Sequence, residues 1–111
     1  MNLTFVYAPV TDLGPALAFY WDTLGWSEAW REGTDTVAFH IPDSTVQVMV
    51  SVDEGASAGP MYLVPDVDGF LGDRPGLRVV MAPRPIPDGQ VAGIADPAGN
   101  VIYVFDQAKA A

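Results

Sequence analysis

The chain of 111 residues contains no cysteine and only one histidine, His40. Without thiols, it can form neither a disulfide network nor a thiolate metal site. Basic residues are also few, because 5 lysines and arginines stand against 14 aspartates and glutamates, for a formal net charge of -9. Nucleic-acid binding requires clustered positive charge to neutralise phosphates, so this balance argues against a nucleic-acid partner. The same negative charge disfavours binding to anionic membranes.

Long apolar runs are absent as well. No run reaches the roughly 20 residues that a membrane-spanning helix needs. Residues 1–4 lack the basic stretch that begins a secretory signal, so we expect a cytoplasmic protein without a membrane partner. Half of the residues, 50%, are hydrophobic, which suits one compact domain over residues 1–111. The end of the chain, 107–111, is expected to fray.

The first half of the chain predicts one strand, one helix and three further strands. Apolar and β-branched residues favour a strand over 3–9, and Asp12 precedes apolar residues at helical spacing, as an N-cap does. Gly25 stands where helices commonly stop. The further strands are expected at 26–31, 36–41 and 45–52, the last because valines occupy every second position.

The second half predicts the same order of elements. Small and polar residues at 53–58 indicate a linker between module one, residues 1–52, and module two, residues 59–106. In module two a short helix is expected at 66–71, and strands are expected at 61–64, 77–81, 90–95 and 101–105.

The two halves also match at a fixed offset. Val10–Leu13 resembles Val64–Val67, 54 positions later, and Met49-Val50 corresponds to Tyr103-Val104 at the same offset. The identity between the halves is low, so the shared order of elements and the shared offset carry the comparison. Such repetition indicates one supersecondary unit used twice.

Several short motifs stand at characteristic places in these elements. A Val-x-Asp-Leu stretch opens the first helix, Phe19-Tyr20 and Leu24-Gly25 lie on it and after it, and Asp96-Pro97-x-Gly99-Asn100 forms the turn before the last strand. In this order the motifs resemble the vicinal oxygen chelate superfamily of glyoxalases, bleomycin-resistance proteins and extradiol dioxygenases. The resemblance covers nearly the whole chain. It implies an α+β fold in which two βαβββ modules form a curved mixed-sheet cup, a small organic ligand in the cup, and a homodimer.

Metal-dependent members of this superfamily take His, Glu or Gln ligands from the first and last strand of each module. By the resemblance, the four positions here are Phe5, Met49, Gly59 and Tyr103. Phenylalanine and glycine have no ligand atom, a thioether suits copper, and a neutral phenol binds divalent ions poorly. The histidine, His40, is expected on another strand. We therefore expect no metal and no other cofactor, which argues against the metal-dependent glyoxalase and dioxygenase mechanisms.

Period-two alternation predicts which side chains line the cup. Phe5 and Tyr7 share one side of the first strand, and Tyr103 and Phe105 share the equivalent side of the last. Aromatic walls suit a flat organic compound, and the acidic balance attracts a cationic one. The residues expected to bind the ligand are Phe5, Tyr7, Trp30, His40, Met49, Met61, Tyr103 and Phe105.

Two tryptophans and the histidine could serve either the cup or ordinary packing. Trp26 and Trp30 are four positions apart in a predicted strand, so they are expected on one face, either as a wall of the cup or as core packing. His40 lies in the next predicted strand, where a lone histidine is more often a packed or surface residue than a catalyst.

Three functions are consistent with these residues. The first is a protein that binds an aromatic or cationic compound, as the antibiotic-resistance members of the superfamily do. The second is a metal-free isomerase or lyase in which His40 acts as base and Tyr7 or Tyr103 donates a hydrogen bond. The third is a structural module whose side chains fill the cup, or cover it as a dimer interface. We predict the first, a protein that binds its ligand without converting it.

Overall fold

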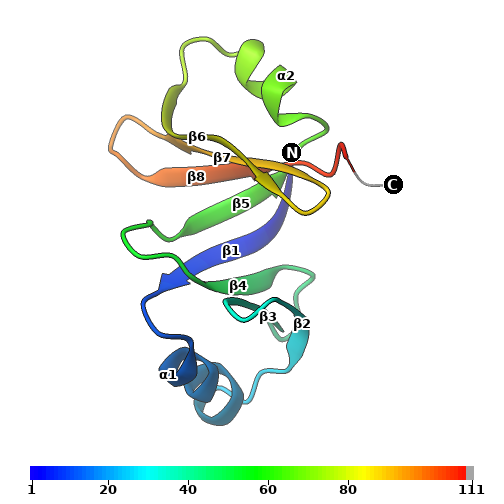
Figure 1. Ribbon diagram of the computed structural model, residues 1–111, viewed down its shortest axis with the longest axis vertical. Helices are drawn as coiled ribbons and strands as arrows, with labels where there is room; N and C mark the ends of the chain where they lie inside the picture. Colours follow the sequence, from blue (N-terminus) through cyan, green and yellow to red (C-terminus); the bar gives the residue numbers. More distant parts are fainter. Residues whose placement is uncertain (110–111) are drawn as a thin grey trace. The chain divides into compact units, whose positions relative to one another are not determined.

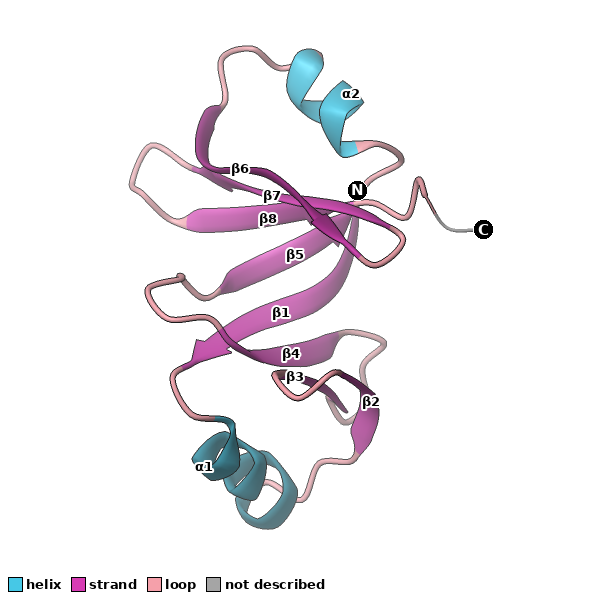
Figure 2. Cartoon of the chain, in the orientation of Figure 1, coloured by secondary structure: helices cyan, strands magenta, loops and turns pink. Residues whose placement is uncertain are grey.

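The computed structural model describes residues 1–109; the last two residues of the predicted frayed end, 110 and 111, lie outside the described residues. Figure 1 shows the course of the chain, and Figure 2 distinguishes its strands, helices and connecting loops. In chain order the elements are β1 (Asn2–Val10), α1 (Leu13–Ala18), the π-helical segment η1 (Phe19–Thr23), β2 (Glu28–Glu32), β3 (Thr36–His40), β4 (Gln47–Val52), β5 (Gly59–Leu63), α2 (Val67–Gly72), β6 (Arg78–Ile86), β7 (Gly89–Ala95) and β8 (Val101–Phe105).

The chain divides into two compact units. The first unit comprises Thr4–Ala58, and the second comprises Met1–Leu3 with the chain from Gly59 onward. The strand order is β2-β3-β4-β1 in the first unit and β5-β8-β7-β6 in the second. The β1–β4 and β5–β8 pairs are parallel, and the other strand pairs within each unit are antiparallel. Each unit therefore follows the order βαβββ, which confirms the predicted α+β fold with two such modules.

In the first unit, α1 covers one face of the sheet. Its N-cap is Asp12, whose carboxylate accepts the N–H of Gly14 at 3.2 Å. The helix runs on into η1, and Gly25, at a φ of 71°, ends it as expected. The buried side chains of the sheet on this face are Val37, Phe39, Val48 and Val50, and they pack against Leu13, Leu17 and Tyr20 among others. Since side chains alternate along a strand, the intervening residues point away from α1.

In the second unit, two carboxylates accept backbone N–H groups in the first turn of α2. Asp66, the N-cap, accepts the N–H of Gly69 at 2.9 Å, and the buried Asp106 accepts the N–H of Val67 at 2.7 Å. The core on this side consists of Val64, Val67, Ala92 and Val104, with Phe70 and Leu71 packed against it. No helix within residues 1–109 is long and apolar enough to cross a membrane.

Strand β6 is longer than the sequence predicts. The expected strand at 77–81 extends to Ile86 and passes through Pro83 and Pro85. Proline lacks the N–H that a central strand must donate, but β6 stands at the end of the strand order in this unit, so one of its sides needs no partner. Its register to β7 shifts twice, between Val79 and Met81 and again between Met81 and Arg84. Pro83 and Pro85 therefore are typical of an edge strand, and they do not mark the point where the strand stops.

The turn before β8 makes a pH-dependent contribution to stability. The Asp96 carboxylate accepts N–H groups of Ala98 at 2.9 Å and Asn100 at 2.8 Å, and the Asn100 side-chain amide at 2.9 Å. The Asn100 side-chain hydrogen bond, followed by its backbone N–H, lowers the pKa of Asp96 below its ordinary value of 3.8. A lowered folded-state pKa stabilises the fold above the unfolded pKa, and this contribution is lost as the pH falls through the folded pKa.

We therefore expect Asp96→Asn to lower the melting temperature at neutral pH, and the gap to the parent protein to shrink below a pH of about 4. Thermal unfolding followed by circular dichroism across this pH range measures the gap. Glu54→Gln, an exposed linker substitution, removes a negative charge in the same way and serves as the control. A gap that stays constant down to the acid limit would contradict the assignment.

Candidate functional site

The face of the first unit that points away from α1 carries most of the predicted ligand-binding residues. Tyr7 on β1 stands opposite Met49 on β4, which stands opposite Ala38 on β3, and Ala38 stands opposite Trp30 on β2. Residues directly opposite each other on neighbouring strands share a face of the sheet. We call this surface, with Phe5, Tyr7, Trp30, His40, Gln47 and Met49, the aromatic face.

A second row of this face brings Phe5, Gln47 and His40 side by side. Phe5 stands opposite Gln47 on one side, and His40 stands opposite it on the other. The Phe5 and Trp30 rings meet edge to face, with 5.7 Å between centroids and planes at 84°. The Trp30 Nε1–H donates to Gln47 Oε1 at 2.9 Å. His40 is exposed, while Phe5, Trp30 and Gln47 are half-buried.

Tyr7 is buried, with 6% of its surface exposed, and its hydroxyl is already engaged. It donates to Oδ2 of Asp53 at 2.6 Å, across 46 positions of sequence. Asp53 comes from the segment that the sequence identifies only as a linker, and nothing in its local pattern indicated the contact. In this arrangement Tyr7 presents its ring to the aromatic face, while its hydroxyl group donates a hydrogen bond to Asp53.

The prediction that Trp26 and Trp30 share a face is wrong. Trp26 packs against the helix-side core of Phe39 and Val48, and its ring centroid lies 5.8 Å from that of Tyr20. Trp30 lies on the aromatic face. Strand β2 begins only at Glu28, and its register shifts before Trp30, so period-two counting does not extend back to Trp26.

In the second unit, Met61, Tyr103 and Phe105 share the face that points away from α2. Met61 stands opposite Tyr103, which stands opposite Gly93 on its other side. The Tyr103 ring lies against this glycine, since a Cβ built at Gly93 would be 3.4 Å from ring atom Cε1. Phe105 stands opposite Leu63 and Val91. All three predicted residues are buried, and their role in ligand binding stays a prediction.

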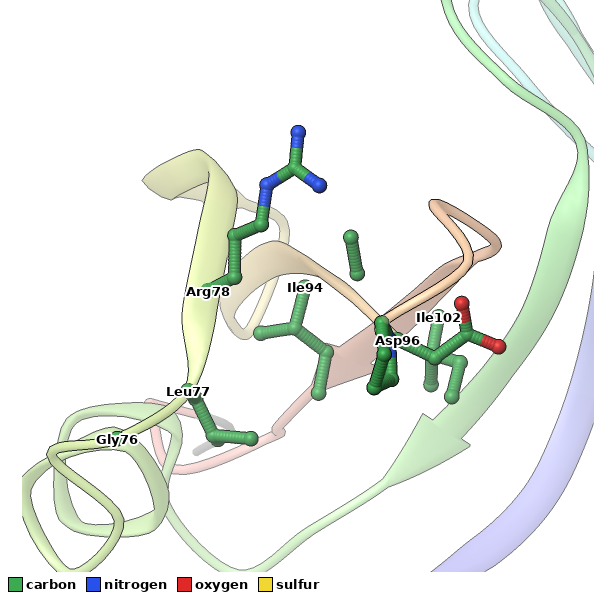
Figure 3. Close-up of a pocket in the computed structure, with 8 residues that line it drawn as sticks. Gly76, Leu77, Arg78, Ile94, Asp96 and Ile102 are labelled. Carbon is green, nitrogen blue, oxygen red and sulfur yellow. The ribbon is translucent and has the colours of Figure 1, made fainter.

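A pocket of about 540 Å³ lies elsewhere in the second unit, between the start of β6, the end of β7 and the turn that follows it. Its lining is mainly apolar, with Leu77, Ile94 and Ile102, and Figure 3 shows the Arg78 guanidinium extending away from Leu77 and Ile94. The Asp96 carboxylate at its edge is engaged by the turn. None of the eight predicted ligand-binding residues lines this pocket.

Solved structures with the same course of the chain identify the fold. A structure described as a glyoxalase/bleomycin resistance protein/dioxygenase superfamily member from Vibrio splendidus 12B01 matches with a TM-score of 0.68 at 13% identity, covering 92% of this chain and 96% of that one. The chain has the vicinal oxygen chelate fold. Methylmalonyl-CoA epimerase from Mycobacterium tuberculosis matches with a TM-score of 0.65 at 23% identity, covering 95% of this chain and 87% of that one.

Function does not follow from these matches. A structure described as NAD-dependent benzaldehyde dehydrogenase from Legionella pneumophila also has the vicinal oxygen chelate fold, with a TM-score of 0.73 at 14% identity and coverage of 92% of this chain and 96% of that one. No protein-family model and no curated protein matches the sequence. Because one fold accommodates different chemistries, the function of this chain has to be argued from its own residues.

The four residues that the resemblance places at metal positions, Phe5, Met49, Gly59 and Tyr103, offer poor metal ligands. Phe5 and Gly59 offer no ligand atom, and Met49 and Tyr103 offer a thioether and a neutral phenol. A Cβ atom at Gly59 would overlap the carbonyl oxygen of Val101, so no ligand side chain fits there unless the backbone moves. Within residues 1–109, no three His, Asp or Glu side chains converge to hold a metal ion.

Proposed function

We propose that this chain is a metal-independent small-molecule-binding protein of the glyoxalase/bleomycin-resistance type, and that it holds an aromatic or cationic compound. The observation that carries the proposal is the chemistry of the metal positions. Two of the four side chains have no donor atom, and the backbone of Val101 blocks a replacement at Gly59. A mechanism that binds two substrate oxygens to a divalent ion is therefore not supported by these residues.

The aromatic face supports a flat organic ligand. Phe5 and Trp30 offer a preorganised pair of rings, and Met49 on the same face offers an adaptable thioether. Small-molecule sites combine such apolar surfaces with a few polar groups that orient the ligand, and Gln47 and His40 are polar groups in the same row. The net charge of -9 favours a cationic or neutral ligand over an anionic one.

Native mass spectrometry of the purified protein, repeated after denaturation, is the first test. We expect either a mass excess that matches an organic compound or ligand-free protein that gains one compound per chain from an aromatic and cationic panel. Added EDTA should leave the bound fraction unchanged. Stoichiometric divalent metal, or binding that EDTA abolishes, would overturn the metal-independent function. The same spectra report subunit number and so test the homodimer that we also propose.

Tryptophan fluorescence locates the ligand. Trp30 lies on the aromatic face, whereas Trp26 packs on the helix side. Binding of an aromatic compound should change the fluorescence of the parent protein and of Trp26→Phe, and the change should be largely lost in Trp30→Phe, which keeps an aromatic ring at the site. If Trp26→Phe loses the change and Trp30→Phe retains it, the ligand binds on the helix side and the aromatic face is not the site.

A second candidate function depends on His40. Its place opposite Gln47 puts a titratable imidazole on the aromatic face, as a metal-free isomerase or lyase would need. Such an enzyme would exchange an acidic C–H of its bound ligand with deuterium from heavy water, and His40→Gln would abolish the exchange even when the variant is saturated with ligand. If the parent protein binds its ligand without exchange, the binding function stands alone.

A further inference from the structure

The side-chain amide of Gln47 has only one consistent orientation. The indole N–H of Trp30 is a donor and cannot accept, so the amide atom at 2.9 Å from it must be the oxygen. The two N–H groups on Nε2 therefore point elsewhere. Among residues 1–109, no hydrogen bond engages Gln47 Nε2, although the side chain is half-buried. Gln47 thus carries two donors whose direction is set by Trp30.

These donors lie beside an aromatic surface. Gln47 stands opposite Phe5 on one neighbouring strand and opposite His40 on the other. Phe5 in turn meets the Trp30 ring edge to face, which restricts the indole that orients the amide. A flat molecule lying against Phe5 and Trp30 would bring its edge to Nε2.

We propose that Gln47 Nε2 recognises a carbonyl-type oxygen on the edge of a neutral aromatic ligand. This inference rests on the proposed binding function and narrows its ligand class. A donor pair requires an acceptor. Arg31, the nearest arginine along β2, is paired with Glu28 at 2.8 Å, so no basic side chain on this strand is available to neutralise a carboxylate. With a net charge of -9 as well, a neutral acceptor such as a ketone or amide fits better than an anion.

The test uses two probes that differ only in the acceptor, 2-acetylnaphthalene and 2-ethylnaphthalene, and a cationic naphthylmethyl-trimethylammonium. Gln47→Glu keeps an oxygen for the Trp30 N–H and replaces both donors by a second oxygen. We expect it to weaken 2-acetylnaphthalene binding by about tenfold or more and to change 2-ethylnaphthalene binding by less than about twofold. In the ¹H–¹⁵N spectrum of the parent protein, the Gln47 amide signals should shift with the ketone and not with the hydrocarbon.

Gln90→Glu is the matched control, because it makes the same chemical change at an amide that donates to Asp68 in the second unit. It should leave the binding of both naphthalenes unchanged. Equal losses for ketone and hydrocarbon in Gln47→Glu, or no loss for the ketone, would overturn the role of Gln47 while the binding function stands. Binding of the cation alone would overturn the ligand class in the same way. Absence of binding by every probe would instead contradict the proposed function itself, and the inference with it.

Discussion

Asp106→Asn is expected to lower the free energy of unfolding by about 3 kcal/mol. The Asp106 side chain is 1% exposed, and its two oxygens accept different backbone donors. Oδ2 accepts the N–H of Val67, the first residue of α2, at 2.7 Å, and Oδ1 accepts the N–H of Gln90 on β7 at 2.9 Å. Asparagine has only one acceptor oxygen, so its NH₂ group would face a buried N–H and leave it without a partner.

The contact joins three elements of the second unit. Asp106 directly follows β8, so its carboxylate links the end of that strand to the start of α2 and to β7. Gly89 permits the close approach, because a Cβ there would overlap the Asp106 carboxylate and carbonyl oxygens. Loss of the link should loosen Val67, which is fully buried in the core of this unit.

Urea unfolding measured by circular dichroism gives the stability difference. Asp73→Asn is the matched control, because Asp73 is exposed at the end of α2 and the substitution removes the same charge. We expect it to change stability by less than about 0.5 kcal/mol. If the two variants are equally stable, the buried carboxylate does not hold α2 as we describe.

Gly59→Ala is expected to cost about 2 kcal/mol of stability, the usual range for inserting a group into occupied space. The added Cβ would overlap the carbonyl oxygen of Val101 and lie 3.7 Å from Cε2 of the Tyr103 ring. Because the obstacle is backbone, no rotamer change relieves it, and β5 or β8 has to shift. Gly76→Ala is the control, since a Cβ there meets nothing within 4 Å and no positive φ is required. It should be neutral or slightly stabilising.

The same position bears on metal binding. Gly59→His introduces an imidazole at one of the four positions that the resemblance predicts for metal ligands, yet its side chain starts from the same blocked Cβ. We expect this variant to be destabilised at least as much as Gly59→Ala and to gain no stoichiometric Ni²⁺ or Zn²⁺ by native mass spectrometry. A stable variant that binds either metal would show that the backbone yields easily, and would remove the main support for a metal-independent function.

Much of the fold was predictable, because the patterns that determine it are local. Alternation along single strands predicted that Tyr7, Met49, Met61 and Tyr103 all line one cup. The register places Tyr7 opposite Met49 in the first unit and Met61 opposite Tyr103 in the second. The caps and stops of the first helix were also predictable from Asp12 and Gly25. Gln47 could have been found in the same way, since it alternates in phase with Met49.

Other features of the site were not predictable, because they depend on where a strand begins and which distant groups meet. Trp26 lies on the helix side because β2 starts two residues after it. Tyr7 meets Asp53 across 46 positions, and Val67 meets Asp106 across 39. A linker aspartate and a C-terminal aspartate have no local pattern that distinguishes them from the exposed carboxylates of this acidic chain.

The sequence by itself therefore determined the two βαβββ modules, the α+β class and the apolar and aromatic sides of most strands, since periodicity and capping act over a few residues. Only the tertiary structure decided which polar groups are engaged. It pairs the Trp30 indole with the Gln47 amide, closes the Gly59 position with the Val101 carbonyl, and buries Asp106 beneath α2. These contacts form because paired strands bring together residues that are far apart in the chain, and a local pattern contains no information about that pairing.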